Sequence, residues 1–477
     1  MNLVDIIILA AYLLFMLWIG AKTFHTVDDL EEFALAGRNL SMPVFFGTLA
    51  ATIIGGWCSV GYASYAYQYG ILVWIADVGF VIFLFILGRY VVGPMRQSGD
   101  MTTGDLFGRA YGRLGRLLVS VLGLALLTGM MGTQCVAAGN IITAFTGLPL
   151  VYGAVISMGV VILYTAMGAL RAVVYTDLVQ FGILYVGLPL AALIGISKIG
   201  FAKVIAAVPP THWHPLGGWA PMAAISFIVG ATFGEQLVPS YTQRYYAAKD
   251  EKVAERGTMA VSVFYIFAML VSLSLGFFAR TIDPNLSNPD LALPVIIKKL
   301  LPVGLSGLVV AAVAAAIMST ADSALASAAT IVVRDIYQTF VNPSAPMKNV
   351  VLLGRITIVL IGVGAVGFSL AVPKVVESLM YAYSFWVPTI VPPLILAVVW
   401  KKGTPYAGIA GILAGGIVTA VWTFVLHEPG GVLGLLPGSI ANIIVYFLVH
   451  FVTKNLEPSG LFRPDIVQDT TNPKSSL

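Results

Sequence analysis

Charged side chains are scarce in this sequence: Asp, Glu, Lys and Arg make up only 10% of its 477 residues. A soluble protein of this length carries roughly 25%. Hydrophobic residues reach 58% and the mean hydropathy is +0.92, so an apolar core alone does not account for the shortage. The chain is therefore predicted to be an integral membrane protein, with lipid as the solvent for most of its length.

Cysteines and basic clusters are also scarce, and each shortage excludes a class of function. The two cysteines, Cys58 and Cys135, lie in apolar segments, which argues against a structural disulfide and leaves too few thiols for a metal cluster. The formal net charge is only +4 and the basic residues are spread among loops, so nothing indicates nucleic-acid binding. The sequence contains neither HExxH nor GxSxG, and we do not expect an enzyme.

Long apolar runs are what the sequence does have, and they predict an all-α protein with about thirteen transmembrane helices. The predicted spans cover residues 4–24, 42–69, 71–95, 115–144, 148–169, 172–196, 218–241, 257–281, 303–334, 350–372, 376–400, 405–426 and 434–453. Residues 1–455 are predicted to form one transmembrane transporter domain, and residues 456–477 a disordered cytoplasmic tail. The first apolar run lacks a preceding basic segment and a following cleavage motif, so it is interpreted as a membrane span.

Lys and Arg are distributed unevenly between the predicted loops, and this bias sets the expected orientation. Most of the 26 basic residues fall on the cytoplasmic side if the N-terminus lies outside, among them Arg109, Arg113, Arg116, Arg244 and Lys249. We therefore expect a multi-pass protein of the cell membrane with its C-terminus in the cytoplasm. A small solute and the lipid bilayer are the partners that the sequence indicates, and no obligate protein partner is evident.

Two predicted helices are interrupted at comparable depth. The segment "LAATIIGGWCSVGYASYAY" has Gly55 and Gly56 at its middle, and "SFIVGATFGEQLVPSY" has Gly234 followed by Pro239. Glycine and proline weaken a helix, and unwound backbone is tolerated in a bilayer only where it lines a cavity. Because the breaks are five helices apart, the sequence predicts a five-helix inverted repeat, helices 2–6 against 7–11, with discontinuous helices 2 and 7 around a solute site. Close helix packing is the alternative explanation for the glycines.

The predicted ninth helix carries a polar face. At 100° per residue, Ala316, Ser319, Thr320 and Ser323 share one stripe, and Asp322 lies beside it. A carboxylate at mid-membrane costs about 2.5–3.5 kcal/mol on insertion scales and therefore needs a partner. No basic residue is near it in the sequence, so the partner is another helix, a bound cation or a proton. Oxygen ligands of this kind suit a hard cation such as sodium, whereas small-residue packing explains the hydroxyl stripe alone equally well.

A second carboxylate, Asp177, follows Thr176 in "RAVVYTDLVQ", near the expected cytoplasmic end of the sixth helix. Together with Asp322 and the hydroxyls of the ninth helix, it can complete one or two cation sites. A protonated carboxyl, or one bonded to a neighbouring helix, is the alternative for each acid.

Four segments of the chain resemble the sodium/solute symporter family: "ATIIGGW" at 51–57, "GALRAVVYTDLVQ" at 168–180, "QRYYAAKD" at 243–250 and "AAIMSTADSALASAATIVVRDIY" at 315–337. Members of that family carry sugars, proline, sialic acid, pantothenate, iodide or choline with sodium. The resemblance covers the membrane region and implies a LeuT-like fold, with sodium-coupled uptake of a small organic solute by alternating access. A proton-coupled carrier of the same fold and a solute sensor without net transport are the alternatives.

The resemblance also implies two sodium sites, carried over by position. The first would use the carbonyl oxygens of Ala51, Ile54 and Ala316 and the hydroxyls of Ser319 and Thr320. The second would use Asp177, Ser319, Asp322 and Ser323. Sodium, as one or two coupling ions, is the only cofactor expected.

The solute is less defined by the resemblance. The "ADS" around Asp322 is shared with the choline-carrier branch, but Ile53 and Val238 stand where those carriers place cage tryptophans, and residues 115–144 contain no Trp. Choline itself is therefore not the expected solute. The residues expected to line the solute cavity are Trp57, Cys58, Tyr62, Glu235, Gln236 and Tyr241. Glu235 is expected either to pair with a cationic or zwitterionic solute or to bond backbone amides at the helix break.

Overall fold

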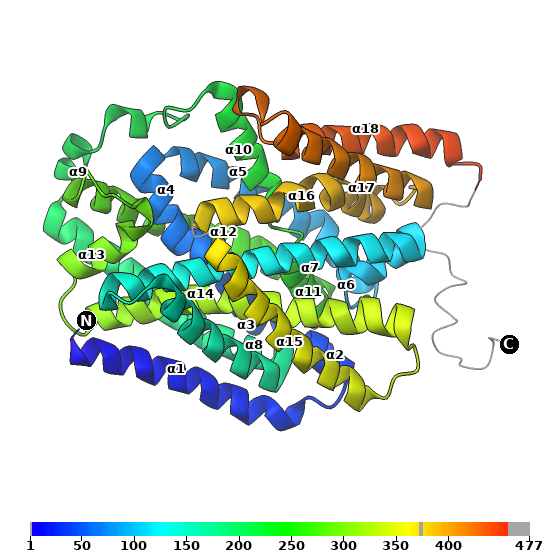
Figure 1. Ribbon diagram of the computed structural model, residues 1–477, viewed down its shortest axis with the longest axis horizontal. Helices are drawn as coiled ribbons and strands as arrows, with labels where there is room; N and C mark the ends of the chain where they lie inside the picture. Colours follow the sequence, from blue (N-terminus) through cyan, green and yellow to red (C-terminus); the bar gives the residue numbers. More distant parts are fainter. Residues whose placement is uncertain (1, 372–374, 457–477) are drawn as a thin grey trace.

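The computed structural model describes residues 2–371 and 375–456, and this part of the chain is built from helices (Figure 1). Among the described residues, eleven helices are long and apolar enough to cross a membrane, and a bent helix pair supplies a twelfth span. The same residues contain no β-strand, although one isolated bridge joins Leu40 to Ala248. The predicted all-α membrane architecture is therefore confirmed.

The helices have the following bounds. The longer α-helices are α1 (Leu3–Thr23), α3 (Met42–Ile53), α5 (Leu72–Leu87), α7 (Thr103–Thr146), α8 (Leu150–Ile199), α10 (Pro221–Gly234), α12 (Glu251–Ile282), α14 (Leu305–Thr330), α15 (Met347–Ala371), α16 (Val375–Ile395), α17 (Pro405–Ala420) and α18 (Leu435–Thr453). The shorter ones are α2 (Leu30–Leu35), α4 (Tyr62–Tyr69), α6 (Gly93–Gln97), α9 (Phe201–Ala207), α11 (Pro239–Ala247) and α13 (Ala292–Leu300). The π-helical segments are η3 (Trp57–Gly61), η4 (Gly88–Val92), η7 (Ile331–Val341), η8 (Leu396–Trp400) and η9 (Val421–Val425). The 3₁₀ turns are η1 (Phe24–Thr26), η2 (Ala36–Arg38), η5 (Pro210–Trp213), η6 (Pro289–Leu291) and η10 (Pro429–Gly431).

Helix α8 contains two membrane spans. Its 50 residues would measure about 75 Å as one straight helix, whereas the hydrocarbon core is about 30 Å thick. Ala169, with φ 46° and ψ −140°, interrupts it. The interruption falls between the predicted spans 148–169 and 172–196, so counting the two arms of α8 separately accounts for the thirteen predicted spans. The predicted tail lies outside the described residues, apart from Leu456.

The first predicted discontinuity is present between α3 and η3. The two halves of this span are bent by 58°, and Ile54 leaves the helix at φ −92° and ψ 73°. A Cβ on Gly55 would lie 2.2 Å from Thr320 Oγ1, and one on Gly56 would lie 2.7 Å from Gln134 Oε1. Only glycine permits this close approach of the break to α14 and α7.

The second discontinuity separates α10 from α11. Helix α10 ends at Gly234 and α11 begins at Pro239, because proline lacks an amide proton and suits the first turn of a new helix. The side chain of Gln236 ties the break back to α10, since its Nε2 donates to the Thr232 carbonyl at 2.8 Å. Both breaks therefore lie where the sequence predicts them.

Helix α14 is the most enclosed span. In its most apolar window 89% of the residues are buried, compared with 28% to 61% in the other ten membrane-length helices of the described chain. Figure 1 shows α14 running between α1 and α7, both of which it contacts. The polar stripe predicted for the ninth helix therefore faces protein.

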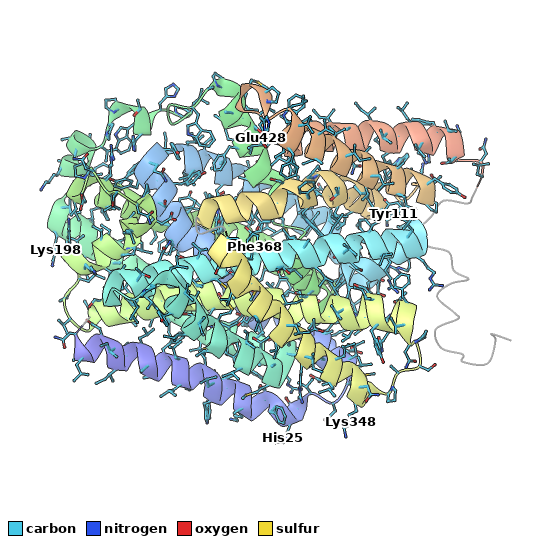
Figure 2. The ribbon with its side chains drawn as sticks, viewed as in Figure 1. His25, Tyr111, Lys198, Lys348, Phe368 and Glu428 are labelled. Carbon is cyan, nitrogen blue, oxygen red and sulfur yellow. The ribbon has the colours of Figure 1, made fainter. Side chains whose placement is uncertain are left out.

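Residues of the predicted external loops and of the predicted cytoplasmic loops lie at opposite ends of the molecule. In Figure 1, α1 begins at the left end of the long axis and α18 ends at the right, as an odd number of spans requires. Figure 2 shows Lys198, on the predicted external side, and Tyr111, between the predicted cytoplasmic Arg109 and Arg113, at opposite ends of the same axis.

Candidate sodium and solute sites

The residues predicted for the first sodium site come together where α14 crosses the end of α3. The Ser319 hydroxyl donates to the carbonyl of Ala51 at 2.8 Å and to that of Ala316 at 3.1 Å. One side chain therefore bridges carbonyl oxygens from two helices. All three residues are completely buried, so these oxygens form a polar spot inside an apolar interior.

Thr320 adds a second bridge to the same place. Its hydroxyl donates to the Thr52 carbonyl at 2.8 Å, and its side chain closes on Gly55. Ile54, also predicted as a ligand, is buried at the non-helical end of α3 between these contacts. Carbonyl and hydroxyl oxygens are the ligands that hard cations prefer, and this cluster offers them without a carboxylate.

The second predicted site contains an arginine that the sequence analysis placed in a cytoplasmic loop. Arg244, on α11, is completely buried, and its Nη2 lies 2.7 Å from Asp177 Oδ2 and 2.6 Å from Ser323 Oγ. Its Nε donates to the Thr48 hydroxyl at 2.9 Å, and Thr48 in turn donates to Asp177. Arg244 is therefore part of the site and does not belong to the charge bias of the loops.

Asp322, on α14, lies against the same cluster and is bonded to Tyr164 of α8. Its Oδ2 accepts from the Tyr164 hydroxyl at 2.6 Å, and its Oδ1 accepts from Ser323 Oγ at 3.2 Å. Asp177 keeps one carboxylate oxygen, Oδ1, buried and without a hydrogen-bond partner among the described residues. Two ionised carboxylates and one guanidinium leave a net charge of −1 here. Since an uncompensated buried charge is costly, the cluster has room electrostatically for one monovalent cation or one proton.

The cavity that contains two of the residues predicted for the solute site, Trp57 and Glu235, lies at the second break, next to the first. It is lined by Trp57, Asp77, Phe80, Phe227, Gly230, Ala231, Gly234, Glu235, Tyr265, Tyr383 and Leu435, and has a volume of about 30 Å³. A single water needs roughly 10–15 Å³ on this measure, so the aromatic side chains must move apart to admit a solute. Carboxylates and aromatic rings dominate the chemistry of this cavity.

Of the residues predicted to line the cavity, Trp57 and Glu235 do so directly. The hydroxyls of Tyr241 and Tyr383 both interact with the Glu235 carboxyl. The Gln236 amide is used within the break: its Oε1 accepts from the Glu235 amide at 3.2 Å. Cys58 lies behind the cavity wall, where its Sγ is 2.7 Å from the Tyr265 hydroxyl.

Tyr62, the remaining predicted residue, is not part of the cavity lining and packs edge-on against Trp57. Sequence analysis missed Asp77, Tyr265 and Tyr383, which do line it. For Asp77 the signal was available: it is an isolated carboxylate in the apolar run "LVWIADVGFVIFLFIL", and an ionisable residue inside a membrane span indicates function.

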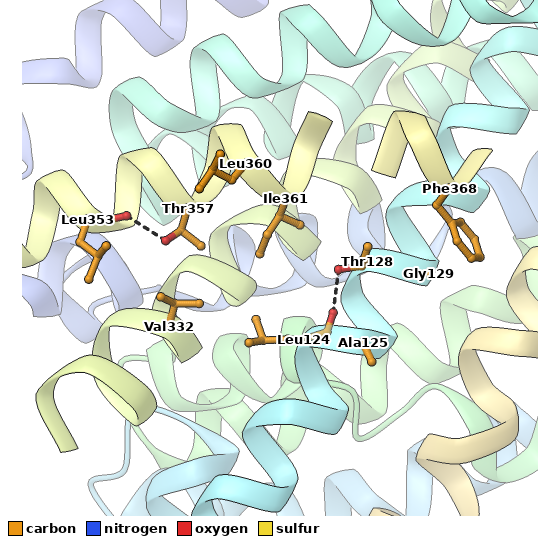
Figure 3. A pocket seen from close by; sticks show the side chains of 10 residues that line it. All are labelled: Leu124, Ala125, Thr128, Gly129, Val332, Leu353, Thr357, Leu360, Ile361 and Phe368. Atoms are coloured by element: carbon orange, nitrogen blue, oxygen red, sulfur yellow. Dashed lines mark hydrogen bonds between the residues drawn. The ribbon is translucent and has the colours of Figure 1, made fainter. Parts of the chain in front are cut away.

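A larger cavity of about 680 Å³ lies elsewhere, between α7, η7 and α15 (Figure 3). Its two threonines, Thr128 and Thr357, each donate to a carbonyl of their own helix at 2.8 Å. The remaining lining is apolar side chains and a glycine, so this cavity presents no group to orient a polar solute. Its size does not make it the functional site.

Two discontinuous helices, an oxygen cluster at one break and a cavity with two acidic side chains beside it define a secondary transporter of the membrane. The model of the sodium:solute symporter family matches residues 33–415. The chain therefore belongs to the sodium:solute symporter family. It is a multi-pass membrane protein that transports a small solute with sodium as the coupling ion, and it is not an enzyme. The predicted resemblance is confirmed, and sodium coupling is favoured over a proton-coupled carrier and over a sensor.

Relatives of the chain are similar over most of their lengths. The osmoregulated proline transporter OpuE of Bacillus subtilis (strain 168) is 26% identical over 472 residues, covering 95% of this chain and 96% of the relative. High affinity choline transporter 1 of Homo sapiens is 29% identical over 443 residues, covering 86% and 75%.

Solved structures share the fold. A Na⁺-coupled sialic acid symporter in a substrate-bound outward-open state superimposes with a TM-score of 0.81 at 19% identity, covering 97% of this chain and 100% of that one. The transporter MhsT in complex with L-phenylalanine gives 0.56 at 15% identity, covering 86% and 98%. The LeuT-like fold is thereby confirmed.

Proposed function

We propose that a sodium ion binds between the carbonyl oxygens of Ala51, Ile54 and Ala316 and the hydroxyls of Ser319 and Thr320. The observation that carries this assignment is the Ser319 hydroxyl, which bridges the carbonyls of α3 and α14 at 2.8 and 3.1 Å. Without the ion, the hydroxyl hydrogens of Ser319 and Thr320 link α14 to carbonyls of α3. When sodium binds, the two hydroxyls rotate so that their oxygen lone pairs face the ion, and the ion takes over this link. Sodium then holds the broken span against α14.

A second sodium is proposed among Asp177, Ser319, Asp322 and Ser323, with Arg244 as a permanent part of the site. The support is electrostatic: with both acids ionised, the cluster carries one negative charge in excess, and Asp177 Oδ1 has no partner among the described residues. Arg244 balances one acid and fixes its position, so the ion balances the other.

In the proposed cycle, sodium enters from outside, orders the break of α3 and η3, and completes the cavity around Trp57 and Glu235. The four-helix bundle that contains the two broken spans then rocks against the rest of the protein and opens the cavity to the cytoplasm. The N-terminus is external and the C-terminus cytoplasmic in this scheme. Because sodium and solute each raise the other's affinity by the same factor, coupling is reciprocal.

The sodium assignment is tested by the thermal stability of the purified protein in sodium chloride and in potassium chloride. An ion at 100 times its dissociation constant stabilises the folded protein by about 2.7 kcal/mol, so we expect a higher melting temperature in sodium. Ser319→Ala should abolish this difference, whereas Ser197→Ala, which removes an exposed hydroxyl bonded only to its own helix, should retain it. Equal stabilisation of the native protein by the two salts would refute the assignment.

Uptake into proteoliposomes provides the second readout. Solute accumulation should follow an imposed inward sodium gradient and should not follow a potassium gradient of the same size. The Ser197→Ala variant should accumulate solute normally in the same preparation.

A further inference from the structure

The solute cavity contains a second carboxylate, Asp77 on α5, which is almost completely buried. Its Oδ2 accepts from the Tyr265 hydroxyl at 3.2 Å, and Glu235, which follows α10, lines the same cavity. The described residues that line the cavity include no Lys, Arg or His. The carboxylate pair therefore has no counter-charge from the described cavity wall.

Two buried tyrosine hydroxyls interact with the Glu235 carboxyl. One belongs to Tyr383, which lines the cavity and is 6% exposed. The other belongs to the buried Tyr241 on α11. The two tyrosines therefore hold the Glu235 carboxyl in place at the cavity.

One backbone amide at each break is already bonded to a glutamine side chain. The Gly56 amide, at the start of η3, donates to Gln134 Oε1 at 2.8 Å. The Glu235 amide donates to Gln236 Oε1 at 3.2 Å. Amides at a helix N-terminus are the usual means of holding a carboxylate. The Gly56 amide at the start of η3 is of this kind and is occupied by a glutamine side chain, whereas the Glu235 amide follows the C-terminus of α10.

We infer that the solute is a small protonated amine that carries N–H groups and no carboxylate, held between Asp77 and Glu235 with its charge over the Trp57 ring. This inference rests on the proposed function and names the substrate class of that site. One of the two acids is ionised and balances the ammonium, and the other carries a proton, so that the occupied cavity is neutral. Each acid accepts an N–H of the ammonium through a carboxyl oxygen, and the ring stabilises the cation. A quaternary ammonium has no N–H to donate, and a site built to hydrogen-bond a ligand rejects the analogue that lacks the donor.

Two matched series of compounds test this substrate class in sodium-containing buffer, with thermal stabilisation and competition binding as readouts. In the first, the ethanolamine skeleton is methylated stepwise to choline. In the second, pyrrolidine is compared with proline, which differs by its carboxylate. We expect ethanolamine to bind about tenfold or more tighter than choline, and pyrrolidine about tenfold or more tighter than proline. Tighter binding of choline or of proline would overturn the inference.

A variant pair assigns the effect to the cavity. Asp77→Asn should weaken amine binding about tenfold or more while the sodium-dependent stabilisation remains, which also shows that the variant is folded. Asp283→Asn, a matched change at a surface carboxylate paired with Lys299, should leave both unchanged. If sodium stabilises the protein but no amine of either series binds, the substrate class is wrong and the sodium assignment stands. If sodium has no specific effect, the proposed function fails first.

Discussion

Asp322→Asn tests the proposal that the buried acid cluster carries a second coupling ion. The amide keeps the size of the carboxylate and can still accept from the Tyr164 hydroxyl, which lies 2.6 Å from Oδ2. What changes is the charge: Asp177 and Arg244 then form a neutral pair. We therefore expect the variant to fold, to retain the first sodium site and to transport one sodium fewer per cycle.

The size of the effect follows from the driving force on one ion. A membrane potential of 100 mV contributes about 2.3 kcal/mol per charge, and a tenfold sodium gradient contributes about 1.4 kcal/mol. Together they correspond to an accumulation ratio of about 500-fold per sodium. The limiting solute ratio of Asp322→Asn should therefore fall by about that factor, whatever charge the solute carries, because the solute is the same in both proteins.

The assay is the static head of solute in proteoliposomes, measured against stepped sodium gradients at a fixed potassium diffusion potential. Asp283→Asn, an identical chemical change in an exposed ion pair, is the control and should match the native ratio. Native-like stoichiometry in Asp322→Asn would show that this carboxylate balances no sodium. If a pH step drives uptake by the native protein without sodium, and Asp322→Asn loses this uptake, then the Asp322 carboxylate carries a proton instead of balancing a sodium ion.

Three further changes examine the first break and the buried ion pair. Gly55→Ala places a Cβ 2.2 Å from a threonine hydroxyl of α14 and should abolish sodium-driven uptake, whereas Gly159→Ala, which meets nothing within 4 Å, should transport normally. Asp177→Asn should destabilise the protein by about 3–5 kcal/mol, because Arg244 is left buried and unpaired; adding Arg244→Gln should recover part of this loss in a chemical denaturation cycle. Gln134→Leu leaves the amide at the start of η3 without its acceptor, and should weaken solute binding about tenfold in competition assays without removing the protein from the membrane.

The sequence predicted those features whose signals are local. Membrane spans follow from apolar runs, and the break at Gly55 and Gly56 follows from two adjacent residues that weaken a helix. The helical spacing of the hydroxyls, together with the family resemblance, predicted that Ser319 lies close to Ala51. Each of these depends on residues that are close in the chain or on motifs that keep their order.

The features that the sequence analysis missed depend on pairs far apart in the chain. Arg244 and Asp177 are 67 positions apart, and a basic residue near the end of a span is naturally assigned to a loop until its partner is known. Tyr265 and Cys58 are 207 positions apart, so the placement of Cys58 behind a tyrosine was beyond any periodicity argument. Asp77 is different, because an acid alone in an apolar span can be recognised from the sequence without knowing its partner.

The proposed sodium and solute sites share one short stretch of backbone, and on this proposal they are coupled without a long pathway. The carbonyl of Ala51 faces Ser319, and Trp57, six positions along the chain, lines the solute cavity. Gly55 and Gly56 between them are fixed by contacts to α14 and α7. An ion that orders the carbonyl end of this stretch therefore orders the aromatic end as well, and a solute that fixes Trp57 lowers the cost of ordering the carbonyls. The coupling free energy is that shared ordering cost, so substitutions within residues 51–57 should change sodium and solute affinities together, whereas substitutions at Asp77 should change solute affinity alone.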